Sequence, residues 1–213
     1  WAQAVPHSSL AQMERVNIRL KLAKMARDEV AVSSRGRVKS IVAQPGLCDD
    51  LCEANKIINS VLSNAPPDPF WYVLALRAAD IGDEGIPKLK ALRDEGAKRF
   101  PFYEDILHEG LKYMAPHWRG HEFEEAARFV EDSVALTKDK RGTVMYARMW
   151  EAYAGPGMGG GSDRFFTDTR AEWPRMKKSY EDILAENGNY QNAVHFLRYA
   201  CLAGDKTTAL AMA

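Results

Sequence analysis

The sequence predicts an all-α protein built from antiparallel helical hairpins, like a tetratricopeptide (TPR) α-solenoid. Three observations support this prediction. Apolar residues recur at helical spacing along almost the whole chain. Alternating apolar runs bounded by hairpin turns, which would indicate strands, are absent. Glycines separate the helical segments at short intervals, as they do at helix C-termini.

The first part of the chain contains two predicted helices and two breaks. A pair of serines can cap a helix over about 10–32, and the polar, basic stretch 33–46 is a predicted loop. Two aspartates then favour a helix N-terminus through the helix dipole, which predicts a helix over 49–64. The prolines within 66–69 end it.

The rest of the chain is a series of predicted helices joined by short turns. Their expected ranges are 70–81, 84–98, 102–114, 122–137, 142–154, 172–186, 190–203 and 206–213. The glycine-rich stretch 155–162 interrupts the series and is a predicted flexible loop. It lacks the Gly-Lys-Ser/Thr continuation and the strand–helix context of nucleotide-binding loops, so it does not indicate a phosphate site.

Two of these helices share one pattern: apolar residues at i, i+3, i+4 and i+7, followed by Gly-Asp. The two sets are Trp71, Leu74, Ala75, Ala78, Gly82 and Asp83, and Ala193, Phe196, Leu197, Ala200, Gly204 and Asp205. We expect each glycine to turn the chain at positive φ and each aspartate to cap the next helix. The small residues Ala209 and Ala213 would allow the following helix to pack closely. This spacing matches the TPR pattern, whose period is about 34 residues.

Composition narrows the class of protein further. Lys+Arg and Asp+Glu both number 29 among 213 residues, so the net charge is zero and a general nucleic-acid binder is disfavoured. No apolar run approaches the roughly 18–20 residues of a membrane-inserted helix. Three cysteines do not make a disulfide scaffold.

The second half of the chain also carries segments that resemble a known family. The segments are Pro116-His117-Trp118-Arg119-Gly120, Tyr146-Ala147-Arg148, Trp173-Pro174-Arg175-Met176 and Phe196 to Asp205. From about Phe102 onward the chain resembles a bacterial family of proteins with TPR-like repeats and no established activity. The resemblance implies a fold and no mechanism. Arg119, His121 and the glycines at 157–161 depart from the family pattern. Residues 1–65 have no counterpart, which predicts an N-terminal helical segment over 1–65 and a repeat domain over 66–213.

A set of aromatic and arginine residues is the predicted partner-binding site. Its members are Trp118, Tyr146, Arg148, Trp150, Trp173, Arg175 and Arg198. These residue types anchor many protein interfaces, although the same residues also suit a helical core. Arg148 and Arg198 each interrupt an apolar helix. A buried arginine there needs a carboxylate partner, whereas a groove arginine would bind an acidic group of a partner.

Histidines and cysteines give weaker signals. His117 and His121 lie near several glutamates, and both residue types are common metal ligands. Their position favours a turn and a helix cap instead, so no metal or other cofactor is predicted. Cys48 and Cys52 could form a disulfide if Cys48 precedes the helix, or remain two thiols. Cys201 is a predicted buried, inert residue of a repeat helix.

These observations predict a non-catalytic protein–protein interaction module of a bacterium, such as an adaptor or a toxin-neutralising immunity protein. One alternative is a metal-dependent hydrolase using His117 and His121. Another is a structural subunit whose groove is filled by residues 1–65. Ala2-Gln3-Ala4 and the Cys48/Cys52 pair favour export to the periplasm, whereas Cys201 narrowly favours the cytoplasm. The sequence leaves the oligomeric state open.

Overall fold

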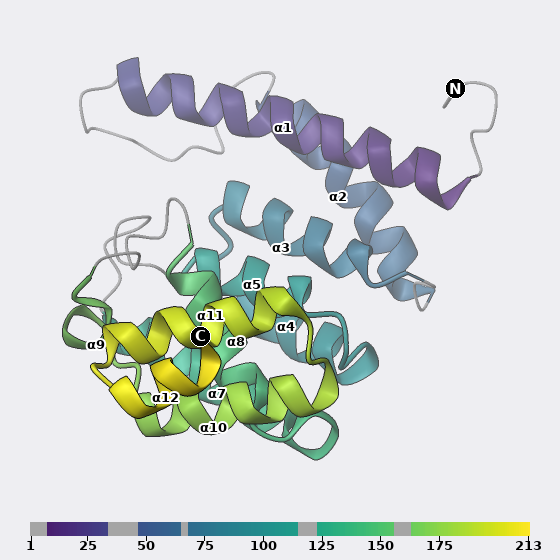
Figure 1. The fold of residues 1–213 in the computed structure, drawn as a ribbon. Coiled ribbons are helices and arrows are strands. Elements are labelled where there is room, and N and C mark those ends of the chain that lie inside the picture. The colour runs from purple at the N-terminus through teal and green to yellow at the C-terminus, as the bar shows by residue number, and fades with distance from the viewer. Residues whose placement is uncertain (1–7, 34–46, 65–67, 115–122, 156–162) are drawn as a thin grey trace. The chain divides into compact units, whose positions relative to one another are not determined.

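The computed structural model describes residues 8–33, 47–64, 68–114, 123–155 and 163–213, without the side chains of 29–33, 47–48 and 123. Within these ranges the chain forms eleven helices and no strand, which confirms the all-α prediction (Figure 1). None of these described helices is long and apolar enough to cross a membrane. The chain separates into two compact units, Trp1–Gly96 and Ala97–Ala213.

The first unit is a group of helices around α3. Its elements are α1 (Ser9–Ser33), α2 (Leu47–Ser63), α3 (Phe70–Ile81) and α4 (Ile86–Arg99), whose last residues extend past the boundary. α1 packs on α2 and α3, and α2 packs on α3 (Figure 1). Ten of the twelve residues of α3 are buried, because this short, strongly apolar helix is covered from several sides.

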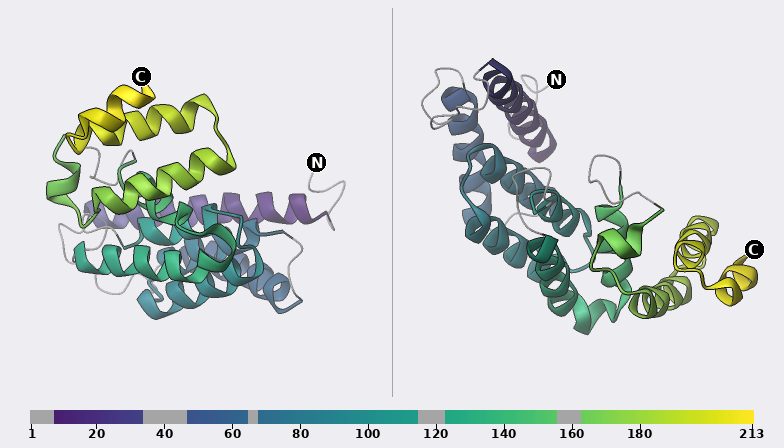
Figure 2. Two further views of the ribbon diagram at one scale, coloured as in Figure 1. Left: turned by 60° about the horizontal axis from the view of Figure 1, so that its bottom comes forward. Right: turned by 90° about the vertical axis from the view of Figure 1, so that its left-hand side faces the viewer.

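In the second unit most helices pack on the next one along the chain. Its elements are α5 (Asp105–Lys112), α7 (Phe123–Arg141), α8 (Val144–Tyr153), α9 (Phe165–Asp168), α10 (Trp173–Glu186), α11 (Tyr190–Leu202) and α12 (Lys206–Met212). α7 packs on α8, α8 on α10, α10 on α11 and α11 on α12, while α5 contacts α7 and α8. Figure 2 shows α10, α11 and α12 side by side in both views.

The predicted helix ranges agree closely with the structure, with one omission. The short helix α9 was not predicted, because its four residues are too few to show helical apolar periodicity. The bounds differ most at α7, which ends four residues beyond the predicted 137, and at α5, which begins three residues after the predicted 102. α2 begins at Leu47, two residues earlier than the aspartates indicate.

The two Gly-Asp turns have different conformations. At the second turn the prediction is confirmed: Gly204 has φ of 71°, and the Asp205 carboxylate accepts a hydrogen bond from the Thr208 backbone N–H at 3.0 Å. At the first turn the prediction is wrong. Gly82 has an ordinary φ of −77° and Asp83 takes the positive φ of 56°.

A close contact between α5 and α7 depends on Gly110. A Cβ atom at this position would lie 2.6 Å from Cζ of Phe129, which is too close for any side chain. The absence of a side chain at Gly110 therefore lets the buried Phe129 ring lie against the backbone of α5.

Candidate functional site

Two of the predicted partner-binding residues belong to the core instead. Tyr146 and Trp150 are each 2% exposed, so a partner cannot contact them, and this part of the prediction is corrected. They share one side of α8, and their rings meet edge to face with centroids 6.4 Å apart. Trp150 also packs edge to face on Tyr153 and Phe165, which extends the aromatic core toward α9.

Trp173 and Arg175 are half-buried at the start of α10, and both have partners within the unit. The Trp173 indole N–H donates to Asp205 Oδ2 at 3.1 Å. The Arg175 guanidinium donates to both carboxylate oxygens of Glu131, at 2.7 and 2.8 Å, and lies 3.9 Å from the centroid of the Tyr146 ring. The hydrogen bond to Glu131 raises the pKa of Arg175. These contacts hold the start of α10 against α7, α8 and the N-cap residue of α12.

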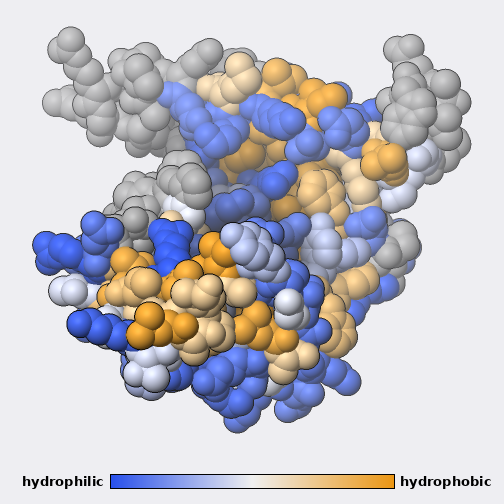
Figure 3. All heavy atoms as spheres, in the orientation of Figure 1, coloured by the Kyte–Doolittle hydropathy of each residue, from blue (hydrophilic) through white to orange (hydrophobic). Residues whose placement is uncertain are grey.

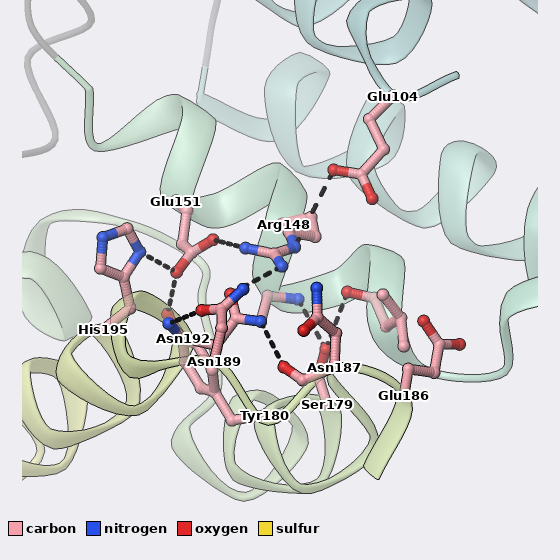
Figure 4. A network of polar contacts seen from close by, with 12 residues as sticks. Glu104, Arg148, Glu151, Ser179, Tyr180, Glu186, Asn187, Asn189, Asn192 and His195 are labelled. Carbon is pink, nitrogen blue, oxygen red and sulfur yellow. Dashed lines mark hydrogen bonds and ion pairs between the residues drawn. The ribbon is translucent and has the colours of Figure 1, made fainter. Parts of the chain in front are cut away.

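Arg148 also has carboxylate partners within the protein. Its Nη1 donates to Glu151 Oε2 at 3.1 Å, and its Nη2 donates to Asn192 Oδ1 at 2.9 Å (Figure 4). Its Nε lies 3.9 Å from Glu104 Oε2. Of the two roles that the sequence left open for Arg148, the structure therefore supports the partly buried, charge-paired one.

Glu151 lies at the centre of this group of contacts. The Tyr180 hydroxyl donates to Glu151 Oε1 at 2.6 Å, and His195 Nδ1 lies 2.7 Å from the same oxygen (Figure 4). Burial, together with the Glu151 carboxylate, raises the pKa of Tyr180 far above its usual range, so the phenol stays a donor. Because Glu151 accepts, His195 Nδ1 is the protonated nitrogen in the hydrogen bond, and Nε2 is directed away from it.

Further residues connect this group to neighbouring helices. The Arg141 guanidinium donates to Glu104 Oε1 at 2.8 Å, and the Asn192 amide donates to the Asn187 carbonyl at 2.7 Å. We call the whole set the Glu151 network. Its members are Glu104, Arg141, Arg148, Glu151, Tyr180, Asn192 and His195. The network joins α5, α7, α8, α10 and α11, so its main physical effect is to hold these helices in register.

The His195–Glu151 pair has the form of a carboxylate-oriented imidazole, which serves enzymes as a general base or metal ligand. Either use needs further groups. In the described part of the chain, no cluster of three or more His, Cys, Asp and Glu side chains could hold a metal ion. The predicted alternative with His117 and His121, like Trp118, lies outside the described residues.

Arg198 differs from Arg148 although the two occupy similar sequence positions. Arg198 is exposed, and within the described residues it has no carboxylate partner; its guanidinium lies 5.6 Å from the centroid of the Tyr199 ring. Of the two roles left open for an arginine in a repeat helix, Arg198 fits the one in which its charge is available to a partner.

An apolar stripe lies beside Arg198 on the same side of α11. Its members follow i, i+4, i+7 and i+11 spacing: Tyr190, Val194, Leu197 and Cys201. We call it the α11 stripe. Tyr190 is 85% exposed, and Leu210 on α12 is 80% exposed. Figure 3 shows the apolar surface over α11 and α12. The prediction that Cys201 is buried is wrong, because Asn192, Phe196, Tyr199 and Ala200 form the buried side of the helix and Cys201 lies on the opposite side.

The cysteine pair of α2 is only partly described. Cys52 is exposed, and Cys48 lies inside the helix, since α2 begins at Leu47. The Cys48 side chain lies outside the described residues, so the predicted disulfide stays a prediction.

Comparisons with protein-family models, with curated proteins and with solved structures find no match to this chain. The resemblance to the TPR-like bacterial family therefore stays a prediction.

The members of the Glu151 network other than Arg148 were missed from the sequence. One signal could have found its centre. Arg148 interrupts an apolar helix and needs a carboxylate, and Glu151 is one turn further along the same helix face. Nothing local indicates Glu104, Tyr180 or Asn192, which come from other helices.

Proposed function

We propose that this chain is a non-catalytic protein-binding module, and that its partner binds along the α11 stripe beside Arg198. The observation that carries the proposal is Arg198 itself, an exposed guanidinium without a carboxylate partner among the described residues, next to four apolar or weakly polar side chains. Apolar contact area bordered by an available arginine is a common composition of binding surfaces.

The scaffold that we propose for this module is a stack of TPR-like helical hairpins. The succession of contacts from α7 to α12 supports it, since each helix apart from the four-residue α9 packs on a neighbour along the chain. The Gly204-Asp205 turn supports it as well, because it has the positive φ and the aspartate cap that the hairpin pattern requires. A small module of this kind suits the capture of one partner, as in an adaptor or an immunity protein.

The Glu151 network supports the proposal indirectly, because it holds α11 in place through side chains outside the α11 stripe. Its Asn192 and His195 come from α11 itself, and their contacts with Arg148 and Glu151 anchor that helix to α8. A binding surface on a rigid helix loses less conformational entropy on association than a surface on a mobile segment.

The exposed thiol of Cys201 provides a direct test. In a variant whose Cys48 and Cys52 are replaced by Ser, a photo-crosslinker attached to Cys201 is activated in extract of the native organism, and the products are identified by mass spectrometry. We expect one predominant adduct that is lost in Arg198→Glu and retained in the control Arg128→Glu, which changes an exposed arginine of α7. Adducts that are equally abundant in both variants would contradict the proposal.

A further inference from the structure

α1 has two apolar sides, and in the described part of its unit only one of them is largely buried. The buried side carries Met13, Val16, Leu20 and Ala23, all at most 6% exposed, whereas the buried Ala11 lies on the other side, one residue beyond Leu10. The other side carries Leu10, Ile18, Leu22 and Met25, which are 62%, 49%, 48% and 60% exposed. A surface helix of a monomer ordinarily has one apolar side and one polar side. The second apolar side of α1 is therefore a candidate interface.

Two charged residues lie within this exposed side. Glu14 and Lys21 are two helical turns apart, and both are exposed. Neither has an ion pair or side-chain hydrogen bond within the described residues. By contrast, Arg19 is paired with Asp50 at 2.8 Å and Arg27 with Asp80 at 3.1 Å. The two charges of opposite sign, unpaired among the described residues, are thus on the largely exposed apolar side.

The order of these residues makes the surface complementary to itself. Two pairs of these residues are centred on the same point of the helix, between Asn17 and Ile18. The pairs are Leu10 with Met25 and Glu14 with Lys21. An antiparallel second copy, related by a two-fold axis at that midpoint, places Glu14 beside the second copy's Lys21 and Leu10 beside its Met25. The same operation brings the two Ile18 side chains together near the axis. Such mutual pairing is what a two-fold interface requires.

We propose that two copies of this chain associate through antiparallel pairing of their α1 helices along Leu10, Glu14, Ile18, Lys21 and Met25. A parallel arrangement would place Glu14 beside Glu14 and Lys21 beside Lys21, which like-charge repulsion opposes. Insertion of this side into a lipid surface would bury the Glu14 carboxylate without a partner, which is also unfavourable. The antiparallel dimer alone pairs every one of these five side chains with a suitable group.

A charge-exchange series tests the proposal by sedimentation velocity over a range of concentrations, from micromolar into the hundreds of micromolar. We expect the unmodified chain to form a dimer whose fraction rises with concentration. In Glu14→Lys each of the two ion pairs becomes a repulsive contact between lysines, and Lys21→Glu creates two repulsive contacts between glutamates. We expect each single variant to weaken dimerisation at least about tenfold.

The double variant Glu14→Lys/Lys21→Glu restores both ion pairs with exchanged signs, so dimerisation should return. Its recovery also shows that both substitutions allow folding, and the control Arg128→Glu should leave the dimer unchanged. A chain that is monomeric at every concentration would overturn the proposal. A dimer that persists in Glu14→Lys, or that the double variant fails to restore, would also overturn it. None of these results depends on the α11 stripe, so the proposed partner binding is tested separately.

Discussion

The two Gly-Asp turns allow a matched pair of glycine substitutions with different expected effects. Gly204 has φ of 71°, and a Cβ atom there would have no neighbour within 4 Å, so the cost of Gly204→Ala is purely conformational. Forcing alanine into the left-handed region costs about 1–2 kcal/mol. Alanine also lowers the conformational entropy of the unfolded chain, which offsets about 0.4–1 kcal/mol of this cost. We therefore expect Gly204→Ala to lower the free energy of unfolding by about 1 kcal/mol.

Gly82 has the same sequence context and an ordinary φ of −77°. An alanine Cβ there would lie 3.3 Å from the Ala78 carbonyl oxygen, a close but tolerable contact that offsets the gain from the unfolded chain. We expect Gly82→Ala to change stability by less than about 0.5 kcal/mol. Hydrogen exchange of the amides in α3 and α12, combined with urea unfolding, measures each turn in its own unit. Equal effects of the two substitutions would refute the assignment of different turn conformations.

Three further predictions concern the second unit. Gly110→Ala should destabilise the protein by about 1–3 kcal/mol in urea unfolding, because the new Cβ would overlap the Phe129 ring. An unchanged midpoint of urea unfolding would contradict the close packing of α5 and α7. Glu151→Gln should cost about 2–4 kcal/mol, because it leaves Arg148 short of a charged partner, and a loss below about 0.5 kcal/mol would show that the network contributes little. Burial lowers the pKa of His108, so the unfolded chain binds the proton more readily. Stability should then fall as the pH drops below about 6.5, and less steeply in His108→Leu; parallel curves for the two proteins would count against this cause.

The helices were predictable because their signals are local. Apolar periodicity and the breaks at glycine and proline place nearly every helix to within a few residues, and α9 is missing because its four residues are too few to show a period. The Gly-Asp pattern predicted one turn correctly. At the other turn Asp83 takes the positive φ in place of the glycine, and the local sequence does not distinguish the two cases.

The site was less predictable because its residues are defined by tertiary contacts. Arg148 and Arg198 have similar sequence surroundings, yet only Arg148 has carboxylates within reach, on α5 and on its own helix. Tyr146 and Trp150 were assigned to a surface because their types suit interfaces, whereas the packing of α8 buries both. Spacing shows which residues share a helix side, but the neighbouring helices decide which side is buried.

The most direct test of the proposed binding function uses the partner that is identified by crosslinking to Cys201. Calorimetry measures the affinity of this partner for the unmodified chain and for matched variants. We expect Arg198→Glu to weaken binding about tenfold or more, because the substitution reverses the only charge of this surface that lacks an internal partner in the described part of α11. Val194→Asp should weaken binding to a similar extent by interrupting the α11 stripe, while Arg128→Glu should leave the affinity unchanged. Affinities that are equal in all three variants would contradict the proposal that the partner binds along α11.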